Sequence, residues 1–174
     1  MIDKRRKCKM IPAYNIHISP LKALLYRRDP FCDPARSAAI LCSSDFSPLS
    51  RRNPFVHYIR LEFQDTPDAR NPYSFRPEQA ETIARFIDGL PAGITDLFIA
   101  CDAGSSRSPA IAAALLRASG RSDKEIWQDP KYTPNPLVYR LACRAFYLYT
   151  PKLLVFHKVR SNRRAYRLAQ RGRA

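Results

Sequence analysis

The chain has 174 residues, and its 30 lysines and arginines against 15 acidic residues give a formal net charge of +15. This length is enough for one domain with a hydrophobic core of its own. No apolar run reaches the roughly 18 to 20 residues that cross a bilayer, and the basic start MIDKRRKCKM is not followed by the apolar core of a signal peptide, so we expect a soluble, cytoplasmic protein.

Predicted strands and helices alternate along the chain, as is typical of an α/β domain. The expected strands are rich in valine, isoleucine and aromatic residues and cover Tyr14–Ser19, Ser37–Ser43, Phe55–Phe63 and Thr95–Cys101. Helical spacing of apolar residues predicts helices at Pro77–Leu90, Pro109–Gly120, Ser122–Asp129 and Asn135–Tyr149. The helical C-terminal half is expected to cover one face of the sheet.

The excess positive charge lies at the two ends of the chain. Residues 1–9 carry five cations and one acid, residues 130–174 carry eleven cations and no acid, and the stretch between them holds fourteen of each sign. We therefore divide the chain into a basic N-terminal extension (1–9), a main domain (10–150) and a basic C-terminal helix or tail (151–174). The favoured interpretation of the last segment is a solvated, partly disordered tail. The alternatives are contact with nucleic acid or with an anionic membrane surface.

The five cysteines are odd in number and far apart, which argues against a secreted disulfide framework. They are Cys8, Cys32, Cys42, Cys101 and Cys143, and no two form a CxxC pair. None of the three histidines is near a cysteine in the sequence, so we expect no zinc site. Cys42 and Cys143 lie in apolar segments and are predicted to be core residues.

One cysteine stands where a buried strand gives way to a helix, in the sequence LFIACDAGSSRSPA (97–110). The small residues between Cys101 and Arg107 can curl so that their N–H groups face an anion at the N-terminus of the helix. The same helix terminus favours the thiolate form of Cys101. Arg107 can give two parallel donors to phosphate oxygens, and Ser108 can donate a hydrogen bond to the sulfur.

A cysteine, five residues, an arginine and a serine between strand and helix resemble the signature of the cysteine-dependent protein phosphatases, and CDAGSSRSPA is most similar to the dual-specificity branch. The likeness extends over roughly residues 37–120. It implies a central, mostly parallel sheet flanked by helices. It also implies hydrolysis of phosphate monoesters, on a phosphorylated protein or another substrate, through a cysteinyl-phosphate and without metal or cofactor.

The resemblance also assigns roles to individual residues. Cys101 is the expected nucleophile, Arg107 binds the phosphate and stabilises the transition state, and Ser108 assists breakdown of the intermediate. The expected phosphate-binding residues are Asp102, Ala103, Gly104, Ser105, Ser106 and Arg107. The charge of Asp102 would oppose an anionic substrate unless it is paired.

In this family an aspartate from a loop between a strand and a helix protonates the leaving oxygen and then deprotonates the attacking water. The segment FQDTPDARNP occupies that place. Asp65, at the end of the predicted strand, matches best, and Asp68 is the alternative.

The chain departs from the family pattern at Ala100, where a histidine usually precedes the nucleophile and helps to hold the loop. This departure keeps a second hypothesis open, a catalytically weak or inactive module that binds a phosphorylated partner. A third hypothesis is a related thiol enzyme, such as a sulfurtransferase or an arsenate reductase. The Ser-Arg-Ser-Pro sequence after the loop favours the phosphatase.

Overall fold

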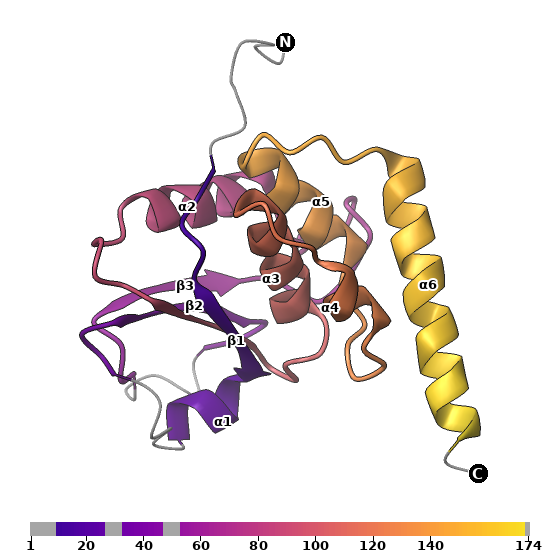
Figure 1. Cartoon of the computed structure of the whole chain (residues 1–174), viewed down its shortest axis with the longest axis horizontal. Coiled ribbons are helices and arrows are strands. Elements are labelled where there is room, and N and C mark those ends of the chain that lie inside the picture. Colours follow the sequence, from indigo (N-terminus) through magenta and orange to yellow (C-terminus); the bar gives the residue numbers. More distant parts are fainter. Residues whose placement is uncertain (1–9, 27–32, 47–52, 173–174) are drawn as a thin grey trace.

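The computed structural model describes residues 10–26, 33–46 and 53–172 (Figure 1). Within this part of the chain, four strands form one sheet in the order β1-β4-β2-β3. Their bounds are β1 Asn15–Pro20, β2 Ser37–Ser43, β3 His57–Glu62 and β4 Asp96–Cys101. All three pairings are parallel. The prediction of an α/β fold with a central parallel sheet flanked by helices is therefore confirmed.

The helices cover both faces of this sheet, with most of them on one side (Figure 1). Their bounds are α1 Leu21–Tyr26, α2 Pro77–Asp88, α3 Arg107–Ala118, α4 Lys124–Gln128, α5 Pro136–Ala145 and α6 Lys152–Arg171. Because side chains alternate along a strand, Ile40 and Ile99 join the cluster of buried residues that contains α3 and α5, whereas Leu41 and Phe98 pack with α1. The short helix α1 is missing from the predictions, although Leu21, Leu24 and Leu25 share its buried face.

The central elements of the core explain where a site can form. All seven residues of β2 are buried, as expected for a parallel strand that is covered on both faces. α3 is buried on most sides, including Ala110 to Leu115. It starts at Arg107, two residues earlier than predicted, and β4 ends at Cys101. Residues 102–106 therefore make the whole connection between a buried strand and a buried helix.

The basic C-terminal segment is a continuous helix, so the expectation of a partly disordered tail is wrong for residues 152–171. Val155 and Asn162 are its buried residues. Lys158 Nζ lies 2.7 Å from the buried carboxylate of Asp123, and Asn162 Nδ2 donates to Tyr132 O at 2.8 Å. Two of the side chains that dock α6 are polar, so the apolar periodicity of this segment is too weak to predict the helix.

The described cysteines outside the loop lie in the core. Cys42 and Cys143 are buried free cysteines, as predicted, and burial raises the pKa of both thiols. Cys8, Cys32 and the N-terminal extension (1–9) lie outside the described residues.

Among the helices that the structure describes, none has both the length and the apolar character of a membrane span.

Candidate active site

The loop 102–106 turns tightly at the C-terminal end of β4. Gly104 has a φ of +69°, and a Cβ at this position would lie 2.6 Å from Pro20 N and 2.7 Å from Ser19 C. Both contacts are with backbone, so neither the conformation nor the space suits a larger residue. The Gly104 N–H donates to Cys101 O at 3.1 Å. The loop is thus folded back against the end of β1.

The segment before α5 supports the loop from the other side. Thr133 N donates to Ser105 O at 2.7 Å, and Asn135 N donates to Ser106 O at 3.3 Å. The loop amides other than that of Gly104 donate to no described residue. The carbonyl groups of Ser105 and Ser106 are therefore held by the segment before α5, whereas several N–H groups of the loop remain able to bind an anion beside the N-terminus of α3.

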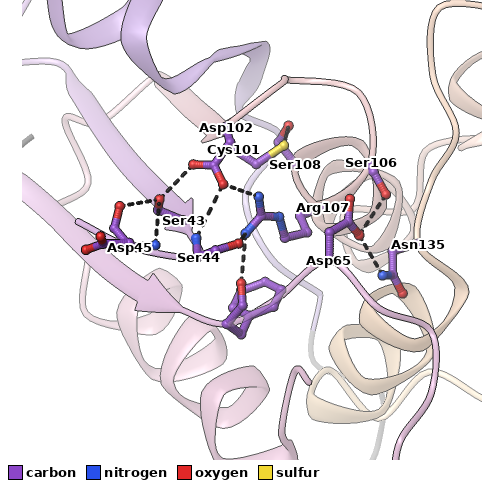
Figure 2. Close-up of polar contacts among 11 residues, drawn as sticks. Ser43, Ser44, Asp45, Asp65, Cys101, Asp102, Ser106, Arg107, Ser108 and Asn135 are labelled. Carbon is purple, nitrogen blue, oxygen red and sulfur yellow. Dashed lines mark hydrogen bonds and ion pairs between the residues drawn. The ribbon is translucent and has the colours of Figure 1, made fainter. Parts of the chain in front are cut away.

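Cys101 lies at the base of this loop and is only 1% exposed. Its Sγ is 3.1 Å from Ser108 Oγ, on the first turn of α3. The structure therefore brings together the predicted nucleophile and the predicted partner of its sulfur. Figure 2 shows the two side chains next to Arg107.

Arg107 is 4% exposed and is held by three hydrogen bonds (Figure 2). Its Nη1 donates to Phe63 O at 2.8 Å and to Ser44 Oγ at 3.2 Å, and its Nη2 donates to Asp102 Oδ2 at 2.5 Å. Its buried Nε has no hydrogen-bond partner among the described residues. A guanidinium has five N–H groups, so the Nε–H and one Nη2–H are left for a ligand. Two such donors on neighbouring nitrogens suit the oxygens of a phosphate.

Asp102 connects the loop to the end of β2. Its Oδ1 accepts a hydrogen bond from Ser43 Oγ at 2.7 Å, and its Oδ2 is paired with Arg107. Partial burial acts to raise the pKa of Asp102, but the hydrogen bonds from Ser43 and Arg107 outweigh it and hold this pKa below its ordinary value. The charge that would oppose an anionic substrate is therefore paired with the arginine that would bind this substrate.

Of the two candidate acids, the structure places Asp65 at the loop. Asp65 Oδ1 accepts hydrogen bonds from Ser106 Oγ at 3.0 Å and from Asn135 Nδ2 at 2.8 Å (Figure 2). Asp68 instead forms an exposed pair with Arg70, with Oδ1 3.1 Å from Nε. The hydrogen bonds from Arg70 lower the pKa of Asp68. The geometry therefore gives Asp65, and not Asp68, access to a group bound in the loop.

Asn135 is the most informative residue that the sequence analysis missed. It is the N-cap of α5, where its Oδ1 accepts hydrogen bonds from Leu137 N and Val138 N. Because this capping fixes the orientation of the amide, Nδ2 points to Asp65. An Asn-Pro pair at the start of a predicted helix indicates a cap, but it does not indicate the acid that the same amide contacts.

Comparisons with known proteins do not establish the chemistry of the site. No family model matches the sequence. No curated protein matches it either. Among solved structures, the chain is similar to a human tyrosine phosphatase-like serine/threonine/tyrosine-interacting protein, with 16% sequence identity and a TM-score of 0.48 over 87% of this chain and 92% of the other. The chemistry of the site is therefore inferred from the residues of this chain.

Proposed function

We propose that the protein is a metal-independent phosphatase that hydrolyses phosphate monoesters of the protein phosphotyrosine and phosphoserine/threonine type through a cysteinyl-phosphate intermediate. One observation supports this most. A buried arginine with an unpaired Nε–H, the thiol of Cys101 and the carboxylate of Asp65 all lie at one small loop whose amides are available to an anion. Each of the two chemical steps can be assigned to these groups.

In the first step, the Cys101 thiolate attacks the phosphorus and the bond from phosphorus to the leaving oxygen breaks. Asp65 gives its proton to this oxygen. Arg107 and the loop amides bind the remaining phosphate oxygens and stabilise the charge that they carry in the transition state. Asn135 acts as a positioning residue, because its amide holds the Asp65 carboxylate beside the loop.

In the second step, water attacks the phosphorus of the cysteinyl-phosphate and gives a proton to Asp65. The sulfur–phosphorus bond breaks, and the sulfur leaves as a thiolate. Ser108, 3.1 Å from the sulfur, stabilises this thiolate with a hydrogen bond. The enzyme returns to its starting protonation state and inorganic phosphate is released.

The second candidate function is a module that binds a phosphorylated partner without turnover, and Ala100 is the observation that favours it. Ala100 is fully buried and packs on the α1 face of the sheet, so no polar side chain at this position contacts the loop. Other contacts support the loop in this protein. They are made by Asp102 with Ser43 and by residues 133–135. We therefore favour the enzyme.

The two candidates are distinguished by turnover of the full chain. We expect hydrolysis of p-nitrophenyl phosphate that is unchanged by a metal chelator. We also expect acid quenching during turnover to trap one phosphoryl group on the peptide that contains Cys101, detected by mass spectrometry. Stabilisation of the protein by inorganic phosphate in a thermal melt, with no release of p-nitrophenol, would instead support the binding module.

The proposal extends to the organisation and location of the protein. The catalytic domain would comprise residues 10–150, and the basic C-terminal segment (151–174), which contains α6, would be an addition to it. The substrate would be a phosphorylated protein or another phosphomonoester. A cytoplasmic location fits this chemistry, because the nucleophilic thiol must stay reduced.

Replacement of Asp65 with asparagine tests the assignment of the acid. We expect kcat to fall by about 10²- to 10⁴-fold for an aryl phosphate with a poor leaving group, and the fall is expected to be much smaller for p-nitrophenyl phosphate, whose leaving group needs less protonation. The decline of rate at high pH is expected to disappear. The measurement is kcat against pH for both substrates.

The matched control is Asp68→Asn, which removes a carboxylate three residues away. The Asp68 carboxylate accepts hydrogen bonds only from Arg70 among the described residues, so its replacement is expected to leave both pH profiles unchanged. A loss of the decline at high pH in Asp68→Asn, with a normal profile in Asp65→Asn, would reverse the assignment.

A further inference from the structure

The outward face of α6 carries a row of arginines. Apart from the adjacent pair Arg163 and Arg164, successive members are three or four residues apart, which places the row on one side of the helix. All five are exposed: Arg160, Arg163, Arg164, Arg167 and Arg171. α6 has no acidic residue. None of the five forms an ion pair with a residue that the structure describes. This arginine face is therefore a strip of positive charge that no acidic residue of the described part of the chain neutralises.

The opposite side of α6 is fixed to the rest of the protein. Val155 and Asn162 are buried there, and Lys158 pairs with the buried Asp123. Asn162 also donates to Tyr132 O. In Figure 1, α6 runs along the outer side of the molecule, with α4 and α5 between it and the sheet. The arginine face thus has a fixed direction, away from the core.

The charge pattern points to a ligand with many closely spaced negative charges. Like charges three or four residues apart on a helix repel one another, and a polyanion would relieve this repulsion. The planar guanidinium groups match phosphate oxygens better than ammonium groups do. The row from Arg160 to Arg171 spans about 16 Å at 1.5 Å per residue, a length over which duplex DNA carries about nine or ten phosphates.

We propose that the arginine face of α6 binds the phosphate backbone of duplex DNA without regard to base sequence. Contacts with phosphates alone give affinity but no sequence preference. The proposal concerns a surface separate from the loop of Cys101, and it does not depend on the phosphatase activity.

A membrane surface is a poorer match for this face. A helix that binds a membrane inserts an apolar face between the lipid headgroups. The apolar residues Val155 and Val159 pack against the protein core instead. The exposed apolar residues of α6 are Leu153 and Phe156, at its start, and Tyr166 and Leu168, among the arginines. At about 100° per residue, Tyr166 and Leu168 point to different sides of the helix, so the four do not form one continuous apolar face.

The test measures binding of the full chain to a short fluorescein-labelled DNA duplex by fluorescence anisotropy over a series of salt concentrations. Two variants remove the same number of positive charges from exposed positions. The first changes the arginine face: R160Q, R163Q, R164Q and R167Q. The second changes arginines of the main domain: R70Q, R85Q, R140Q and R144Q. Glutamine keeps the helix propensity of arginine, and circular dichroism checks the folding of both variants.

We expect the first variant to bind the duplex at least about tenfold more weakly than the unchanged protein, and its slope of log affinity against log salt to be shallower by about 0.9 for each arginine that contacts a phosphate. The second variant is expected to bind like the unchanged protein. Both are expected to keep their activity on p-nitrophenyl phosphate.

Three results would overturn the proposal. One is an equal loss of binding in both variants, which would mean that only the net charge matters. Another is the absence of duplex binding by the unchanged protein. The third is binding to phosphatidylserine vesicles that the first variant loses while its DNA affinity stays the same.

Discussion

Replacement of Cys101 with serine is expected to lower kcat on aryl phosphates by a factor of about 10⁴ or more. A serine hydroxyl is far less acidic than a thiol, so the loop cannot hold it as an anion that attacks phosphorus. The variant is expected to fold, since the two side chains are close in size and the serine keeps Ser108 as a hydrogen-bond partner. It should still bind inorganic phosphate, measured as a rise in melting temperature.

Cys42→Ala is the matched control for this substitution. Cys42 is a second fully buried cysteine, on the strand β2 that pairs with β4. Burial raises the pKa of its thiol, so it is not an anion at neutral pH. We expect its loss to lower the melting temperature and to leave kcat unchanged. Turnover by Cys101→Ser at the rate of the unchanged protein would rule out the cysteinyl-phosphate.

The second large effect is expected for Arg107→Lys, with a fall in kcat/KM of about 10²- to 10³-fold. This change keeps the positive charge and removes the planar guanidinium group, which can donate two parallel hydrogen bonds. A single ammonium group cannot donate to Phe63 O and pair with Asp102 while it also gives two parallel donors to a phosphate. Steady-state kinetics on p-nitrophenyl phosphate measure this effect, and circular dichroism confirms that the variant is folded.

Arg117→Lys provides the control, because Arg117 lies on the same helix, ten positions further along the sequence. It donates to Tyr139 Oη and Tyr149 O, in the packing of α3 against α5. We expect this variant to be less stable in a thermal melt but to keep its kcat/KM. If both lysine variants lose activity equally, the arginines of α3 act on stability, and the role assigned to Arg107 is wrong.

The strands and helices were predictable where the local sequence pattern matches the burial of the residues in the structure. The bounds of β2 are those predicted, because an apolar run between polar turns defines a fully buried strand. The prediction for β3 extends too far in both directions. Phe55 and Phe63 lie just outside the strand, and both are buried for other reasons. Phe55 packs on Phe98, while Phe63 packs on Phe75 and its carbonyl oxygen accepts a hydrogen bond from Arg107.

The candidate site was likewise predictable only in part. Cys101, Arg107 and Ser108 are close in sequence, and one turn between strand and helix is enough to bring them together. Ser43 and Asn135 reach the same place from distant parts of the chain. Their contacts depend on the order of the strands and on the packing of α5, which local sequence patterns do not contain.

One short stretch of backbone joins the two surfaces for which functions are proposed. The carbonyl of Tyr132 is bound by Asn162 of α6, and the amide of the very next residue, Thr133, is bound to Ser105 in the loop of the nucleophile. A shift of α6 would therefore be transmitted, across a single peptide unit, to the loop whose amides are proposed to bind phosphate. If a ligand bound to α6 changes the affinity of the loop for phosphate, then phosphate must change the affinity of α6 for that ligand by the same factor.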